Sequence, residues 1–103
     1  MQKSCQLSEV VDALGILGSA KRLKLLSVMH EGPQTPLELA EKSDEPLRVW
    51  YHLQMLLRGG LVKREGQGKE VYYSLCPERL ECVIKTLINL RDDTPNLFND
   101  QLS

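Results

Sequence analysis

The sequence predicts a small, mostly α protein that carries one β-hairpin. Two features of the apolar spacing lead to this prediction. Through most of the 103 residues, apolar side chains recur at intervals of three and four, which is the period of an amphipathic helix. From Leu61 to Leu75 the interval becomes two, interrupted by Gly66, Gln67 and Gly68, as in two short strands joined by a flexible turn. The expected order is helix, helix, short helix, helix, hairpin, helix.

Three helices are expected in the first part of the chain. The first covers residues 7–17, and the second follows Ser19, which is a favourable N-cap. The third begins with a capping box, in which Thr35 is the N-cap, Pro36 the first helical residue and Glu38 the reciprocal partner. The apolar faces expected in the first two helices are Leu7, Val10, Val11, Leu14 and Leu17, and then Leu23, Leu26 and Met29.

The remaining two helices flank the hairpin. The fourth is expected to begin at Pro46, after a cap at Asp44 or Glu45, and to end at the glycine pair that precedes the first strand. The fifth covers residues 77–92 and carries the most continuous apolar stripe of the chain. Such a stripe favours an oligomer, because a domain of this size cannot cover the stripe with its own residues.

Length and composition fit one soluble domain, with 42% hydrophobic and 26% charged residues. Residues 1–92 are expected to form this domain, while residues 93–103 are polar and aperiodic and are expected to form a loosely ordered tail. No apolar run approaches the roughly 18 residues of a membrane span, and the N-terminus lacks the features of a signal peptide. We therefore expect a cytoplasmic protein with no membrane partner.

Charge is unevenly distributed along the chain. The formal net charge is −1, whereas nucleic-acid-binding domains are usually basic. Between Pro46 and Tyr73, however, five basic residues are accompanied by only two acidic ones. This local excess fits phosphate contact, although a solvated, charged hairpin would have the same composition.

The order of elements is that of a winged helix-turn-helix, in which the fourth helix lies in the major groove and the hairpin reaches the flanking backbone. The stretch YHLQMLLRGGLVKREGQGKEVYYSL, from Tyr51 to Leu75, resembles the ArsR/SmtB-type repressors of bacteria and archaea. In that family a YHL or HHL triplet near the end of helix four is followed by a leucine, a GLV and a wing that closes in VYY. The resemblance extends more weakly to the other helices. It implies a DNA-binding transcriptional regulator, acting as a repressor, that binds a palindromic operator as a homodimer.

The resemblance assigns the base-reading face to Leu47, Arg48, Trp50, Tyr51 and Gln54. Arg48 can pair with guanine and Gln54 with adenine, whereas the other three depart from the Ser, Thr and Gln usual in the family. Three interpretations of Trp50 stay open, namely DNA contact, packing against helix three and contact with another protein. His52 lies beside the apolar side of the same helix, so we expect it to be buried and hydrogen-bonded.

The wing is expected to contact phosphate or the minor groove through Lys63, Arg64, Gln67 and Lys69. A solvated hairpin is the alternative. The apolar stripes of the first and fifth helices are expected to pair across a two-fold axis. The residues expected in this homodimer interface are Val10, Leu14, Leu80, Val83, Ile84, Leu87 and Ile88.

No metal site or cofactor is expected. The three cysteines have no CxxC spacing, which favours free thiols. Metal sensors of the family carry a cysteine pair at the start of helix three or an Asp/His set on helix five, and this chain has neither. The resemblance leaves one alternative, in which Cys5 and Cys82 bind a soft metal or arsenite, or oxidise to a disulfide.

An enzyme is not expected, because His30 and His52 have no evident carboxylate partner or oxyanion loop in the sequence. The expected partners are double-stranded DNA and a second copy of the chain, and an effector of unknown chemistry is left open. The alternative function is a winged-helix module that binds another protein and does not bind DNA specifically. The acidic total and the apolar face formed by Leu47, Trp50 and Tyr51 would fit that alternative.

Overall fold

The computed structural model describes residues 5–92, except the side chain of Gln67, and confirms a mostly α winged helix-turn-helix. The predicted tail, residues 93–103, lies outside the described part. The elements are α1 (Leu7–Leu17), α2 (Ala20–His30), α3 (Pro36–Glu41), the 3-10 turn η1 (Pro46–Arg48), α4 (Val49–Arg58), β1 (Val62–Gln67), β2 (Glu70–Leu75) and α5 (Pro77–Asp92).

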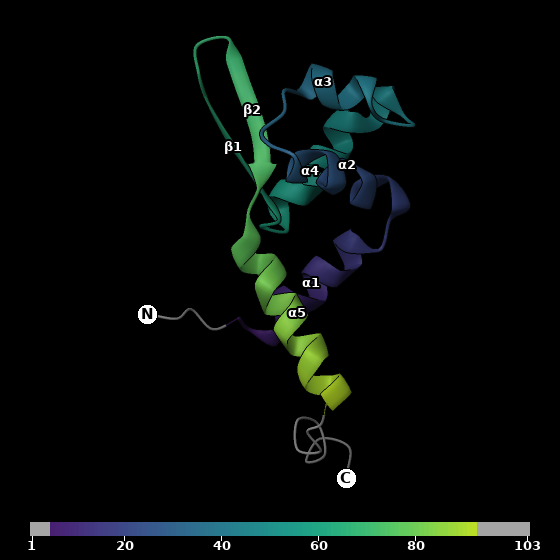
Figure 1. Cartoon of the computed structure of the whole chain (residues 1–103), viewed down its shortest axis with the longest axis vertical. Helices are drawn as coiled ribbons and strands as arrows, with labels where there is room; N and C mark the ends of the chain where they lie inside the picture. Colours follow the sequence, from purple (N-terminus) through teal and green to yellow (C-terminus); the bar gives the residue numbers. More distant parts are fainter. Residues whose placement is uncertain (1–4, 93–103) are drawn as a thin grey trace.

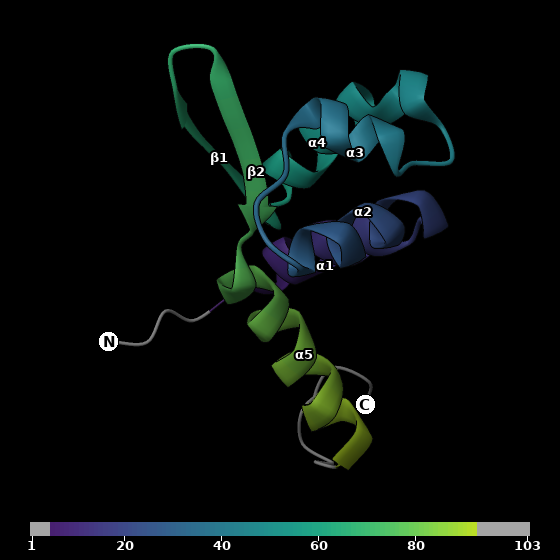
Figure 2. The ribbon, with the colours of Figure 1, turned by 45° about the horizontal axis from the view of Figure 1, so that its top comes forward.

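The hairpin and the α3–α4 pair lie at one end of the molecule, and α5 runs from the base of the hairpin toward the other end (Figures 1 and 2). α1 packs beside α5, while α2 lies between α1 and the α3–α4 pair (Figure 2). One apolar core joins all the helices to the base of the hairpin. Its buried members are Val10, Ala13, Ile16, Leu25, Leu26, Met29, Leu39, Val49, Leu53, Leu56, Leu61, Val62, Tyr73 and Val83.

The core-facing sides of α1 and α2 differ from those predicted. In α1 the buried residues are Val10, Ala13 and Ile16, whereas Leu7 and Leu14 are exposed. In α2, Leu25 is buried and Leu23 is exposed. Both helices carry apolar residues on more than one side, so periodicity alone does not identify the side that meets the core. The exposed residues of α1 leave an apolar surface beside α5.

Helix starts follow the predicted capping chemistry in α2 and α3 but not in α4. Thr35 Oγ1 accepts a hydrogen bond from the Glu38 amide at 3.1 Å, and the Glu38 carboxylate accepts one from the Thr35 amide at 2.9 Å. The Ser19 hydroxyl likewise accepts from a backbone amide of α2. The fourth helical segment begins at Pro46 as predicted, but its first turn is the 3-10 turn η1, and the α-helix α4 begins only at Val49. The side-chain cap expected at Asp44 or Glu45 is absent from η1. The Glu45 carboxylate is directed toward other side chains instead.

The hairpin turn is shorter than predicted. β1 and β2 pair antiparallel as far as Gln67 and Glu70, so the turn consists of Gly68 and Lys69. Gly66 belongs to β1, where a Cβ atom would collide with the backbone of Glu70 in the facing strand. Gly68 has a positive φ of 62°, which glycine adopts at little cost.

The hairpin is tied to the helices through Tyr73. Its amide donates to the Gln34 carbonyl at 2.8 Å, and its carbonyl accepts from the Gln34 amide at 2.9 Å. The Tyr73 ring is buried, whereas Tyr72 on the opposite face is exposed and donates its hydroxyl to Glu70. One of the two adjacent tyrosines thus joins the core, while the other lies on the outer face of the hairpin.

Cys5 and Cys82 form a disulfide, with Cα atoms 5.9 Å apart. The expectation of three free thiols is therefore wrong for this pair, and the oxidised alternative is the one observed. The bond ties the segment before α1 to the middle of α5. A disulfide has no thiolate available, so the pair cannot ligate a soft metal in this form. Cys76 is free.

Candidate nucleic-acid interface

The five residues predicted to read bases all face solvent. α4 buries Val49, His52, Leu53 and Leu56, so the opposite side of the helix is directed away from the core. The exposed fraction is 96% for Leu47, 58% for Trp50 and 47% for Tyr51. At this exposure Trp50 does not fill a crevice against α3, so that interpretation is not supported. The exposed residues of η1 and α4 that we call the reading face are Leu47, Arg48, Trp50, Tyr51 and Gln54.

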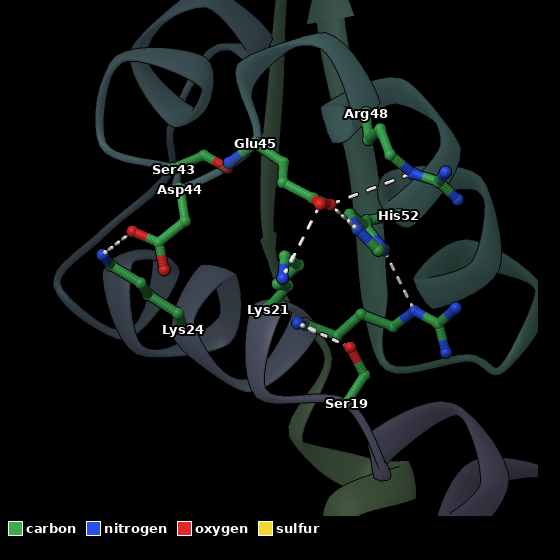
Figure 3. Close-up of polar contacts among 9 residues, drawn as sticks. Ser19, Lys21, Lys24, Ser43, Asp44, Glu45, Arg48 and His52 are labelled. Carbon is green, nitrogen blue, oxygen red and sulfur yellow. Dashed lines mark hydrogen bonds and ion pairs between the residues drawn. The ribbon is translucent and has the colours of Figure 1, made fainter.

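Arg48 is held on the reading face by two contacts. Its guanidinium carbon lies 4.8 Å from the centre of the Tyr51 ring, within the range of a cation–π interaction. Its Nε lies 3.9 Å from Glu45 Oε1, and its two terminal nitrogens point away from that carboxylate (Figure 3). Arg22 approaches the same Tyr51 ring at 5.7 Å. The end of Arg48 that could fork onto a base is thus left open.

The wing presents basic side chains on exposed positions of the hairpin. Lys63, Arg64 and Lys69 are all exposed, and the side chain of Gln67 lies outside the described part. Lys63 pairs weakly with Glu65, with Nζ 3.8 Å from the carboxylate. Among the described residues, no acidic side chain forms an ion pair with Arg64 or Lys69. These two cations are therefore free to meet an anion.

His52 is buried beneath the reading face with 5% of its surface exposed, which confirms its predicted position. Arg22 Nε donates a hydrogen bond to His52 Nδ1 at 3.2 Å. Burial lowers the pKa of His52 below its ordinary value of 6.5, and the positive charges of Arg22 and Arg48 act in the same direction, while the Glu45 carboxylate opposes them. The neutral imidazole is favoured near pH 7.

Glu45 is the acidic centre of this region, a role that the sequence did not indicate. Its carboxylate lies 3.6 Å from Lys21 Nζ, 3.9 Å from Arg48 Nε and 3.7 Å from His52 Nε2 (Figure 3). Next to it, Asp44 pairs with Lys24 at 2.9 Å, and this contact holds the pKa of Asp44 below its ordinary value. Both carboxylates link the turn between α3 and α4 to α2. Their position before a helix predicts only caps, because the lysines of α2 that they contact lie 20 or more residues earlier in the chain.

The residues predicted for the homodimer interface divide into two groups. Val10 and Val83 are 2% and 4% exposed and belong to the core of the protomer. Leu14, Ile84, Leu87 and Ile88 are between 39% and 52% exposed, and Leu80 is half-buried. Leu7, Val11 and Leu90 add further exposed apolar surface on the same two helices. The surface available to a partner is therefore the outer side of α1 and α5.

Other chemistry has little geometric support in residues 5–92. No group of three or more His, Cys, Asp or Glu side chains is placed to hold a metal ion there. The free thiol of Cys76 donates to Glu78 at 3.3 Å, and burial together with that carboxylate raises the Cys76 pKa. In the same range, no helix is both long and apolar enough to cross a membrane.

The chain matches known proteins in structure, whereas two comparisons of its sequence give no match. No protein-family model matches the chain. No curated protein matches it significantly in sequence either. Among solved structures, an ArsR-like transcriptional regulator from Rhodococcus sp. RHA1 superimposes with a TM-score of 0.73 at 22% identity, covering 82% of this chain and 80% of that one.

Two further structures extend the comparison. The homodimeric winged helix-turn-helix DNA-binding domain of a possible ArsR-family regulator from Mycobacterium bovis has a TM-score of 0.66 at 20% identity, with 82% of each chain covered. The transcriptional regulator HlyU from Vibrio vulnificus CMCP6 is 30% identical, with a TM-score of 0.62, over 81% of this chain and 88% of that one. These neighbours are transcriptional regulators rather than enzymes. The chain thus has the winged helix-turn-helix fold of ArsR-family transcriptional regulators, and it shares 30% identity with the transcriptional regulator HlyU over most of both chains.

Proposed function

We propose that this protein is a sequence-specific DNA-binding transcriptional regulator that acts as a homodimer on a palindromic operator. The observation that carries the proposal is the solvent-directed reading face of η1 and α4, with Arg48 at its start. The fourth helix of such a fold enters the major groove, where base edges are distinguishable. A surface that only needed to be soluble would not place Leu47, Trp50 and Tyr51 around an arginine in this position.

The chemistry of the reading face suggests what it reads. The open end of Arg48 can donate two hydrogen bonds to O6 and N7 of guanine, and Gln54 can pair with N6 and N7 of adenine. Each such pair discriminates against a wrong base by about 1–3 kcal/mol. Leu47 and Trp50 can contact thymine methyl groups, which are the apolar feature of the major groove. Guanine, adenine and thymine contacts within one half-site are therefore expected.

The wing supplies contacts that position the protein without selecting sequence. Arg64 and Lys69 are exposed cations without an ion pair in the described part, so binding a phosphate would not require breaking an ion pair of theirs. Lys63 is available too, since an exposed pair such as its contact with Glu65 is worth at most about 1 kcal/mol. Phosphate contacts of this kind release counterions, which makes the affinity depend on salt.

Homodimerisation follows from the outer surface of α1 and α5. Leu14, Ile84, Leu87 and Ile88 form an apolar surface that the protomer does not cover. Pairing of identical surfaces generates a two-fold axis, and two copies of α4 related by that axis match a palindromic operator. The domain from Mycobacterium bovis is described as homodimeric, which supports this assignment. A repressor role rests on the family resemblance and on the simple mechanism of occupying a promoter.

A second function is favoured by one observation. Leu47, Trp50 and Tyr51 form an exposed apolar surface next to each other, and the chain as a whole carries a charge of −1. Exposed tryptophan and tyrosine residues are common at the centres of protein interfaces. A winged-helix module that binds a protein partner instead of DNA is the alternative on these grounds.

The experiment that separates these functions is selection of bound duplexes from a pool of random sequences by the purified protein. The proposal predicts enrichment of a palindrome whose half-sites lie about one helical turn apart, or a multiple of that spacing. It also predicts that affinity for the enriched duplex falls steeply between low and moderate salt. A pool that stays random after repeated rounds would refute specific DNA binding and favour the protein-interaction module.

A further inference from the structure

A chain of polar contacts leads from the buried interior to the reading face. It begins at Arg22 of α2, whose Nη1 donates to the carbonyl of Ile16 at the end of α1 at 3.1 Å. The same guanidinium donates through Nε to His52 Nδ1. The Arg22 guanidinium is therefore held by two hydrogen bonds, and it fixes the imidazole of His52 relative to α1 and α2.

The contact with Arg22 determines which nitrogen of His52 carries the proton. A guanidinium can only donate, so Nδ1 must be the acceptor in the neutral imidazole. The proton of the neutral ring consequently lies on Nε2. Nε2 has no hydrogen-bond partner in the described structure, and it lies 3.7 Å from Glu45 Oε1. The N–H dipole of a buried ring is thus placed next to the Glu45 carboxylate.

Glu45 in turn is placed next to Arg48, on the Nε side of its guanidinium. The carboxylate approaches Arg48 through Nε, and both terminal nitrogens of the guanidinium point away from it (Figure 3). A carboxylate that competed with DNA for Arg48 would engage those terminal nitrogens instead, because they form the fork that pairs with guanine. The observed geometry leaves the two terminal nitrogens of Arg48 free and restrains the guanidinium through Nε.

We infer that Glu45 is a positioning residue for Arg48, held by His52 and Arg22, and that it sets the sequence specificity of the reading face. This inference rests on the proposed DNA-binding function. A long arginine side chain loses conformational entropy when it binds a base, and a side chain that is already restrained loses less. Glu45 therefore contributes to discrimination between bases although it touches none of them.

A purely structural role for Glu45 is the competing explanation. Its carboxylate also lies 3.6 Å from Lys21, so it could simply fasten the turn between α3 and α4 to α2. It also adds a negative charge near the expected DNA surface, and removal of any such charge strengthens binding to all DNA. The test must therefore separate an effect on Arg48 from effects on folding and on net charge.

The experiment compares Glu45→Gln with the wild-type protein on an operator selected from random duplexes and on a shuffled duplex of the same composition. Glu41→Gln is the matched control, because it removes the same charge from the exposed end of α3. The measured quantity is the ratio of the two dissociation constants. Glu45→Gln should lower this specificity ratio about fivefold per half-site, which is the scale of an exposed ion pair, while Glu41→Gln should leave it within about twofold.

The decisive step repeats the measurement in an Arg48→Ala background. If Glu45 acts through Arg48, then Glu45→Gln should no longer change the specificity ratio once Arg48 is absent. An unchanged ratio for Glu45→Gln alone, or an equal fall with and without Arg48, would overturn the inference. Thermal unfolding of each variant shows whether the fold is retained. A wild-type protein that selects no sequence would refute the proposed function itself, and the inference with it, whereas a selective protein insensitive to Glu45→Gln refutes only the inference.

Discussion

The guanidinium carbon of Arg48 lies 4.8 Å from the centre of the Tyr51 ring, so two residues of the reading face are joined before any DNA is bound. Cation–π contacts at exposed sites are worth about 0.5–1 kcal/mol. Tyr51→Ala should therefore weaken operator binding by about this amount, whereas Tyr51→Phe keeps the ring and should bind like the wild type. Fluorescence anisotropy with labelled operator measures the difference. Equal losses for both variants would assign the effect to the hydroxyl group and not to the ring.

The wing should control affinity but not specificity. Lys69 lies in the hairpin turn and carries no ion pair among the described residues, so Lys69→Ala is expected to remove one phosphate contact per protomer. The slope of log affinity against log salt should then fall by about one unit per lost contact, or about two per dimer. Titrations of operator and shuffled duplex at several salt concentrations test this. Lys85→Ala on α5 is the control and should keep the wild-type slope.

The outer side of α5 should carry the homodimer. Leu87 is 46% exposed in the protomer, and a glutamate there would place an unpaired charge in the interface at a cost of several kcal/mol. Leu87→Glu should therefore lower the molar mass in sedimentation equilibrium from dimer toward monomer. Lys85→Glu introduces the same side chain at a nearby exposed position and should remain dimeric. A Leu87→Glu protein that stays dimeric would place the interface elsewhere.

Stability should decrease as the pH falls below neutrality, because of His52. Burial lowers its pKa below 6.5 in the folded protein, so the unfolded chain binds the proton more readily. The stabilising contribution is complete above the unfolded value and is lost as the pH falls from about 7.5 toward 5.5. His52→Gln should flatten the fall in Tm over this range, whereas His30→Gln at the exposed end of α2 should retain it. A wild-type Tm that does not change in this window would contradict the prediction.

The disulfide between Cys5 and Cys82 should stabilise the fold. It closes a long loop, since the two cysteines lie 77 positions apart in the sequence, and the loss of such a bond usually costs about 2–5 kcal/mol. Cys82→Ser should lower the free energy of unfolding in urea by an amount in this range, and Cys76→Ser should not. A reducing agent should destabilise the wild-type protein and leave Cys82→Ser unchanged. If reduction has no effect on the wild type, the bond does not contribute to stability.

The parts of the fold that depend on local chemistry were predictable. The change of apolar period located the hairpin, and the capping box of Thr35 and Glu38 located the start of α3, because each pattern is complete within a few residues. The solvent-directed side of α4 was predictable for the same reason. The buried side of α1 was not, since Leu7 and Leu14 are as apolar as Val10 and Ile16 and only the neighbouring helices decide which side is covered.

The parts of the site that depend on distant contacts could not be predicted. Arg22 and His52 are 30 residues apart. The two bridged cysteines are 77 apart, and only the family resemblance offered their pairing as an alternative. Nothing in the local pattern pairs them, because tertiary packing brings them together. Glu45 was missed for a related reason. Its position before a helix predicts a cap, yet its carboxylate lies near Lys21, Arg48 and His52 instead.

The central claim is that the reading face recognises sequence, and its most direct test is the ratio of dissociation constants for a selected operator and a shuffled duplex at one salt concentration. Specific regulators typically prefer their sites by about a thousandfold or more. We predict a ratio of this order for the wild-type protein, and a loss of about 1–3 kcal/mol per contact for Arg48→Ala on the operator only. A wild-type ratio close to one would contradict the account.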